Sequence, residues 1–325
     1  MVTIKDVAKA AGVPEKTVMR ALAGKIMGKR RDARERAERV RKAAEELGYV
    51  PSGLASSLRR GKTRTIGLLT GYITNRFFAS LAETVMDECE KYGYHVRLEL
   101  TRQKSDKTLE CLADLRRARV DGIFYATPCF PEVREELERI QRSGMPVIFP
   151  VGRDCSGAFK TVFAELKEKG CRHITFAPWH AYPGEIIQEE SICRELCAEY
   201  GFDFSVFPLY SLGDAEKLAE LHPETLICTA PHFVRHFCKV KDADCRTAIV
   251  GIYDEWNVVD HPGELTGILL AQSEEAVRCA VRNLIAAAEG AENPPPELFP
   301  VTYYPQKDFH KIVFKDLFAK HLQNE

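Results

Sequence analysis

Apolar residues recur at helical spacing in three segments at the start of the chain. The first segment follows Thr3, which with Asp6 has the form of a capping box, and it ends at Gly12. Its apolar positions are Ile4, Val7, Ala8 and Ala11. The third segment spans residues 32–47 and ends at Gly48. The pattern predicts short helices in the first fifty residues.

The second segment has two different faces. It begins near Pro14, a residue suited to the first turn of a helix, and it ends at Gly24. Its apolar stripe consists of Val18, Ala21 and Leu22, and its polar face carries Lys16, Thr17 and Arg20. Two short helices joined by a tight turn form a helix-turn-helix, whose second helix enters the major groove of DNA. The pattern therefore favours a DNA-binding head.

Strand and helix patterns alternate from Ile66 onward. The predicted strands are 65–70, 95–100, 122–126, 146–149, 173–177, 226–229 and 248–253, with a closing strand at 301–304. The predicted helices are 77–92, 107–118, 133–143, 157–169, 188–200 and 273–288. This order predicts an α/β body whose parallel sheets are doubly wound, with helices on both faces.

Charge is distributed unevenly between the head and the body. Residues 1–64 contain 17 Lys and Arg against 7 Asp and Glu, a net charge of +10, whereas the rest of the chain carries −11. A basic segment confined to one small domain is the electrostatic footprint of nucleic-acid binding. Residues 51–61 lie between the two parts and are too short to form a stable helix alone, so we interpret them as a linker.

Composition narrows the cellular context. The first residues are polar and charged where a secretory signal is apolar, and no apolar run approaches the roughly 20 residues of a membrane span. We therefore expect a cytoplasmic protein. The 11 cysteines are scattered and odd in number, which favours reduced thiols. Cys193 and Cys197 share one helical face without a second pair, which indicates packing rather than a metal site.

The sequence gives no support for catalysis. It contains no Walker loop, no nucleophile elbow, no metalloprotease motif and no dinucleotide fingerprint after the first strand. His95, His173, His180 and His232 have no evident catalytic partner. We expect neither an enzyme nor a cofactor. A solute-binding protein that serves a transporter is the other alternative, and the basic head and the absence of an export signal weigh against it.

Residues across nearly the whole chain resemble the LacI/GalR family of bacterial repressors. The specific matches are Thr3–Val13 and Thr17–Val18 in the head, and Tyr49, Pro51, Ala55 and Leu58 in the linker. Weaker matches follow in the body at Asn75–Phe78, Gly93–Tyr94, Val120–Ile123, Gly144–Val147, Gly170–Ile174, Ile249–Gly251 and Gln272.

The resemblance implies an architecture. It comprises a helix-turn-helix domain (residues 1–50), a hinge helix (51–61) and a body similar to type 1 periplasmic binding proteins. The body would have an N-terminal subdomain (62–149 and 273–298) and a C-terminal subdomain (150–272 and 299–325). The family further implies a homodimer on a palindromic double-stranded DNA operator, regulated by a small-molecule effector in the cleft. We predict a repressor.

The resemblance assigns DNA contacts to named positions. Lys16, Thr17 and Arg20 match the base-reading positions, and Arg is suited to a bidentate contact with guanine. Leu58 matches the hinge leucine that is wedged into the minor groove and kinks the duplex. Further DNA contacts are expected from Thr3, Lys29, Arg30, Ser57 and Arg59. The basic stretch 25–31 is longer than is usual in the family.

The effector pocket departs from the family pattern. Asn75, Phe77, Phe78 and Gln272 lie where pocket residues are expected. Where the family has an Arg early in the helix 188–200, this chain has Glu189. The family's Asp after a Gly-aromatic pair aligns with Tyr253, which leaves Asp254 one position later. An Asn-Asp pair aligns with Ala230-Pro231, and the crossing segment 151–157 is shortened.

Three interpretations of the pocket remain open. An amine or other cationic ligand would be bound by Glu189 or Asp254, with aromatic contacts from Trp179, Tyr253 and Phe78. A sugar would be held by Asp154, Trp179 and Gln272. Alternatively the cleft has lost its ligand, and control has passed to a protein partner or to protein abundance.

Overall fold

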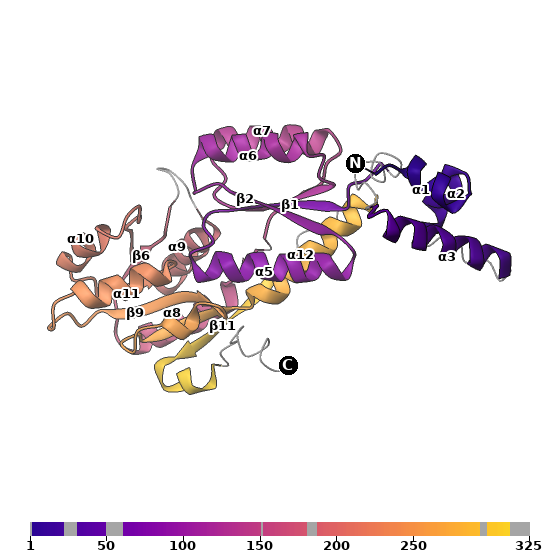
Figure 1. The fold of residues 1–325 in the computed structure, drawn as a ribbon. Coiled ribbons are helices and arrows are strands. Elements are labelled where there is room, and N and C mark those ends of the chain that lie inside the picture. Colours follow the sequence, from indigo (N-terminus) through magenta and orange to yellow (C-terminus); the bar gives the residue numbers. More distant parts are fainter. Residues whose placement is uncertain are drawn as a thin grey trace. The chain divides into compact units, whose positions relative to one another are not determined.

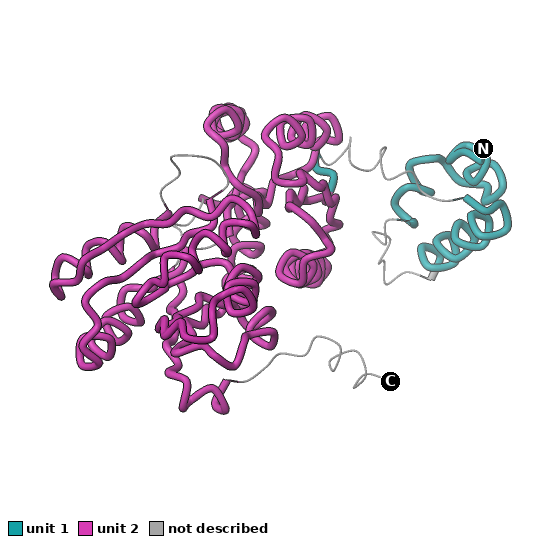
Figure 2. The backbone as a smooth tube through the Cα atoms, turned by 90° about the vertical axis from the view of Figure 1, so that its left-hand side faces the viewer, with its two compact units in different colours: residues 1–63 teal, residues 64–325 magenta. Residues whose placement is uncertain are grey.

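The computed structural model describes residues 2–22, 31–49, 61–150, 152–180, 187–292 and 298–312. The chain divides into two compact units, residues 1–63 and residues 64–325 (Figure 2). No helix among the described residues is both long enough and apolar enough to cross a membrane. We call the first unit the head and the second the body.

The head is a small helical domain. Its helices are α1 (Ile4–Ala11), α2 (Glu15–Leu22) and α3 (Arg31–Glu46). The backbone N–H and the hydroxyl of Thr3 donate to the Asp6 carboxylate at 2.8 and 2.7 Å, which confirms the predicted capping box. Gly12 ends α1 with a φ of +63°, a conformation that favours glycine. Val7, Val18 and Val40, one from each helix, are fully buried in the common core.

One half of the body is built on a parallel sheet with the strand order β2-β1-β3-β4. These strands are β1 (Thr65–Thr70), β2 (His95–Leu100), β3 (Gly122–Ala126) and β4 (Val147–Ile148). One face is covered by α6 (Ser105–Arg117) and α7 (Pro131–Arg142), and the other by α5 (Arg76–Lys91) and α12 (Ser273–Ala288) (Figure 1). We call this the four-stranded half.

The other half has a sheet with the strand order β5-β11-β10-β9-β8-β6-β7, in which β10 and β11 are antiparallel and the other pairs are parallel. The strands are β5 (Arg153–Asp154), β6 (His173–Ala177), β7 (Asp203–Val206), β8 (Thr225–Cys228), β9 (Ala248–Asp254), β10 (Gly267–Ala271) and β11 (Phe299–Pro305). The helices are α8 (Ser156–Glu168), α9 (Gln188–Tyr200), α10 (Asp214–Glu220) and α11 (Pro231–Val240), followed by the 3-10 helices η1 (Val258–Asp260) and η2 (Gln306–Lys311). We call this the seven-stranded half.

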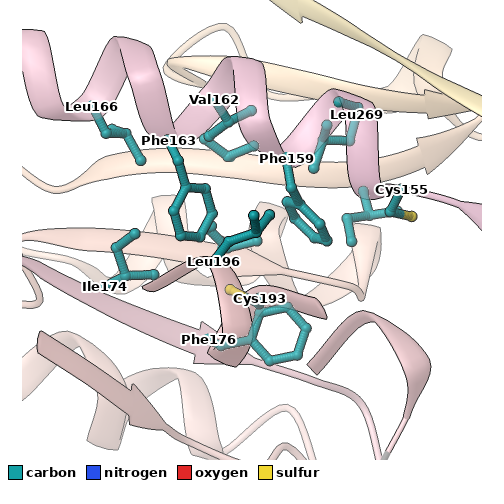
Figure 3. Close-up of a cluster of buried hydrophobic side chains, with 14 of the residues drawn as sticks. Cys155, Phe159, Val162, Phe163, Leu166, Ile174, Phe176, Cys193, Leu196 and Leu269 are labelled. Carbon is teal, nitrogen blue, oxygen red and sulfur yellow. The ribbon is translucent and has the colours of Figure 1, made fainter. Parts of the chain in front are cut away.

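Apolar side chains fill both faces of the larger sheet. On one face, Phe159 and Phe163 of α8 meet Leu196 of α9 over Ile174 and Phe176 of β6 (Figure 3). Fully burying a side chain of this size stabilises the fold by roughly 1.5–3 kcal/mol. Because helices cover both faces, the inner strands β8 and β10 are almost continuously apolar and buried, as expected for strands covered on both sides. The predicted α/β body is confirmed.

The chain crosses between the two halves more than once. Helix α12 lies between β10 and β11 in sequence, yet it packs against α5, β3 and β4 of the four-stranded half. Strand β5 follows β4 and pairs with β11 in the seven-stranded sheet. These crossings bring residues of distant segments to the junction of the halves, where a cavity lies.

Candidate functional site

The polar face of α2 is accessible in the head. Lys16 and Arg20 are exposed and Thr17 is half-buried, whereas Val18 and Ala21 on the opposite face are buried against the other two helices. The side chains predicted to read bases are therefore held on a short helix whose position is fixed by its buried face. Guanidinium, hydroxyl and ammonium groups together supply the donors that base edges and phosphates accept.

The remaining predicted DNA contacts differ in how far the structure describes them. Thr3 is exposed, and its hydroxyl donates to Asp6. That hydrogen bond lowers the pKa of the Asp6 carboxyl. The other predicted contacts lie outside the described residues: Lys29, Arg30, Ser57, Leu58 and Arg59.

A cavity of about 550 Å³ lies between the two halves of the body. The four-stranded half lines it with Tyr72, Asn75, Arg76, Phe77, Phe78 and Gln103. The seven-stranded half lines it with Arg153, Trp179, Thr229, Ala230, Pro231, His232, Arg235, Ile252, Asp254, Asn257 and Asp260. The cavity is large enough for a small organic ligand and combines aromatic walls with charged groups.

Several of the predicted effector residues line this cavity. They are Asn75, Phe77, Phe78, Trp179 and Asp254. Asn75 also caps α5, because its side-chain oxygen accepts from the Phe77 N–H at 2.9 Å. Trp179 donates its backbone N–H to the Thr229 hydroxyl at 3.0 Å, which ties two lining segments together.

Four other predicted effector residues do not line it. Gln272 lies at a smaller neighbouring pocket, and Asp154 is exposed and accepts from the Ser156 N–H at 3.1 Å. Glu189 lies 4.0 Å from the Arg153 guanidinium. Tyr253 is fully buried in the core, because successive side chains of a strand point to opposite sides and its neighbours Ile252 and Asp254 face the cavity.

Sequence reasoning missed the arginines of the cavity. Arg76 follows the Asn75 cap, Arg153 lies in the shortened crossing segment, and Arg235 lies one turn beyond Ala230-Pro231. Arg235 is 3.5 Å from Asp260. The signal was their place next to segments already aligned with the family's pocket. That all three arginines line the same cavity depends on contacts between segments that are remote in sequence.

Asp254 organises the turn that follows β9. One of its carboxylate oxygens accepts from the N–H groups of Trp256 and Asn257 at 2.9 and 3.1 Å, and the other accepts from the Asn257 side-chain amide at 2.7 Å. Asp254 is 2% exposed, and this burial raises the pKa of its carboxyl to about 6, against the opposing effect of Arg153. We call residues 254–257 the cavity turn.

The cavity turn connects the two halves. The carboxylate of Glu255 accepts from the N–H groups of Ser273 and Glu274, both at 2.7 Å, and so satisfies the N-terminus of α12. Trp256 is fully buried in the core of the four-stranded half, where its ring lies 5.6 Å from that of Phe77. Three successive residues thus contact the cavity, the crossing helix and the opposite core.

The head matches the model of a known protein family. Residues 3–52 match the family model described as "Bacterial regulatory proteins, lacI family". This part of the head is similar to the LacI/GalR family. The match covers the helix-turn-helix, Tyr49 and Pro51, which are some of the positions on which the sequence resemblance rested.

Curated relatives extend the similarity beyond the head. The "HTH-type transcriptional repressor PurR" of Vibrio atlanticus (strain LGP32) is 38% identical over 165 residues, covering 50% of this chain and 47% of the relative. The "Ribose operon repressor" of Halalkalibacterium halodurans is 35% identical over 182 residues, covering 54% and 53%. The chain spans about half the length of these curated relatives. Both relatives are named as repressors.

A solved structure shares the fold over nearly the whole chain. The lac repressor dimer bound to operator and the anti-inducer ONPF aligns with a TM-score of 0.77 at 15% identity. The alignment covers 94% of this chain and 98% of that chain. This likeness shows that the helical head and the α/β body follow the lac repressor fold.

Proposed function

We propose that this chain is a transcriptional repressor that binds a palindromic operator as a homodimer and is controlled by a small-molecule effector in the cavity. The observation that carries the proposal is the accessible face of α2, with Lys16, Thr17 and Arg20 on the second helix of a helix-turn-helix of the lacI family. A helix presented in this way fits the major groove.

Each DNA contact in the proposal has its own chemistry. Arg20 donates to a guanine edge, Thr17 offers a hydroxyl or a methyl, and Lys16 reaches a base edge or a phosphate. Thr3, Lys29, Arg30 and Arg59 are assigned to the backbone, where contacts set register rather than sequence. Ser57 and Leu58 are assigned to the minor groove, with Leu58 as the apolar wedge.

Effector control is assigned to the junction of the two halves. A ligand in the cavity touches residues of both halves, so its affinity depends on their relative arrangement. The cavity turn provides the connection, because Asp254 faces the ligand while Trp256 is anchored in the opposite core. The effector can change DNA binding only if it binds one arrangement of the two halves more tightly than the other.

Selection from a randomised pool of duplex DNA tests the proposal. The full chain is expected to enrich a palindromic sequence with two matching half-sites, because a symmetric dimer presents two recognition helices. Arg20→Ala should lose this enrichment or relax one position of each half-site. Arg41→Ala is the matched control, since Arg41 is exposed on α3 and has no assigned DNA contact.

The outcomes are distinct. Enrichment of one palindrome by the wild-type chain and the Arg41→Ala variant supports the proposal. A pool that stays random after repeated rounds with folded protein would reject it.

A further inference from the structure

We propose that the effector is an organic anion, a carboxylate or a phosphate ester, whose charged group is held by Arg153 together with Arg76 and Arg235. This inference rests on the proposed function, because it names the chemical class of the ligand in the same cavity. It departs from the amine and the sugar, which were two of the three interpretations that the sequence left open.

The first argument is the balance of charge on the cavity wall. Three guanidinium groups line the cavity, from Arg76, Arg153 and Arg235, against the two carboxylates of Asp254 and Asp260. Arg235 and Asp260 are paired with each other at 3.5 Å. The oxygens of Asp254 already accept hydrogen bonds from the cavity turn. Hydrogen bonds from neutral N–H groups do not cancel the charge of Asp254, so the wall carries three cations against two anions, a net charge of +1.

The second argument concerns the carboxylate partners of Arg76 and Arg153, the two arginines that are not paired with Asp260. Within the described part of the chain, Arg76 has no carboxylate within 4.0 Å, and Arg153 reaches only Glu189, at 4.0 Å. The Glu189 carboxylate does not line the cavity. Arg153 is the better anchor, because its side chain is only 30% exposed and a partly desolvated guanidinium attracts an anion more strongly than an exposed one. The planar guanidinium of Arg153 can make two parallel hydrogen bonds to a carboxylate or a phosphate.

The third argument comes from two helix N-termini. Helices α5 and α11 both begin at the cavity wall, with Arg76 and Phe77 on the first and Pro231 and His232 on the second. Asn75 caps α5, whereas α11 has no side-chain cap. The positive ends of both helix dipoles thus add to the arginines. Pro231 has no N–H, and the N–H groups of Phe233 and Val234 donate to the Ala230 carbonyl at 3.0 Å, so the first turn of α11 offers a ligand only the N–H of His232.

The aromatic wall defines the rest of the ligand. The rings of Trp179 and His232 lie 5.0 Å apart in an edge-on arrangement, and Phe78 lines the cavity from the opposite half. Burial, and then the charge of Arg235, lower the pKa of His232, so this imidazole is neutral at neutral pH. Such walls accommodate a ring. The ligand is therefore an anion that carries a sugar-like or planar ring.

Thermal unfolding of the full chain tests the anion site with inorganic sulfate and with acetate, each against chloride at equal ionic strength. Wild type should gain about 2–4 °C more in sulfate, in acetate or in both than the Arg153→Gln variant does. Sulfate also stabilises proteins through exclusion from their surface, but that effect is common to both chains. A larger gain in sulfate indicates a phosphate ester, and a larger gain in acetate indicates a carboxylate.

Two further variants make the result decisive. Arg134→Gln removes an exposed arginine of α7 that does not line the cavity, and it should behave as wild type. Arg76→Gln replaces Arg153→Gln as the test variant if the latter does not fold. Equal gains in wild type, the cavity variant and Arg134→Gln would overturn the anion site.

Operator binding by the same proteins separates this inference from the proposed function. If wild type binds the selected operator but gains no more thermal stability than Arg153→Gln in either salt, the anion site is rejected and the proposed repressor function is retained. If the anions stabilise wild type more than Arg153→Gln but no operator is bound, the anion site is supported and the proposed repressor function is rejected.

Discussion

The head and the body expose their functional groups in opposite ways. In the head, Lys16 and Arg20 lie on the outside of one short helix, within five residues of each other in sequence. In the body, Arg76, Arg153 and Arg235 come from three remote segments and face a cavity. An exposed helix face is suited to a large, regular partner such as DNA, whereas the wall of a cavity is suited to a small ligand. The same type of side chain thus serves different partners according to how the fold presents it.

The largest expected effect separates the two regions completely. Val18→Asp places an unpaired charge in the core of the head, where Val18 is fully buried. A domain of about 60 residues has little stability to lose, so the head should unfold and operator binding should disappear. The anion-dependent rise in the unfolding temperature of the body should remain. Measuring both on one sample checks this, and loss of both would mean that the regions fold as one unit.

A large effect is also expected within the body. Trp256→Ala removes a fully buried ring from the core of the four-stranded half and should lower the free energy of unfolding by about 3–5 kcal/mol. Chemical denaturation gives this value. Val259→Ala is the control, because Val259 is 46% exposed in the neighbouring η1 and should change stability little. A small effect of Trp256→Ala would show that the cavity turn does not anchor the opposite half.

Titration of Asp254 should be visible in the stability of the body. Its folded pKa of about 6 lies above the unfolded value of 3.8, so the folded state holds the proton more tightly. The proton on Asp254 therefore contributes about 3 kcal/mol to the free energy of unfolding below about pH 4. This contribution is lost as the pH rises toward 6. The difference in unfolding free energy between wild type and Asp254→Asn should follow this curve. A difference independent of pH would contradict the raised pKa.

The smallest effect concerns a single contact of the head. Arg20→Ala should weaken binding to the selected operator by about ten- to a hundredfold, the range for one bidentate contact with a base. The loss should be smaller for unrelated DNA, since phosphate contacts persist. Fluorescence anisotropy with both duplexes measures the two affinities. An equal loss on both would make Arg20 a phosphate contact.

The sequence predicted those parts of the fold that local patterns determine. The capping box at Thr3, the glycine at position 12 and the helix 188–200 appear as expected. Helix α11 and strand β10 were missed, although Gly267–Ala271 is an apolar run. A short apolar run does not distinguish a buried strand from other buried structure. Helix α11 begins at Ala230-Pro231, which had been considered only as an aligned pocket segment.

The cavity was less predictable than the fold for a physical reason. Whether Tyr253 or Asp254 faces the ligand depends on strand register, and a shift of one residue exchanges the two faces. The cation surplus depends on bringing Arg76 of α5 next to segments that follow it by more than seventy residues. Neither property is encoded by local spacing.

The salt dependence of operator binding tests the central claim most directly. The full chain is titrated with the selected operator by fluorescence anisotropy at about 50 and 200 mM chloride. If the basic head neutralises several phosphates, affinity should fall by about a thousandfold or more between these conditions. An affinity that does not change with salt would contradict the account that this chain is a DNA-binding repressor.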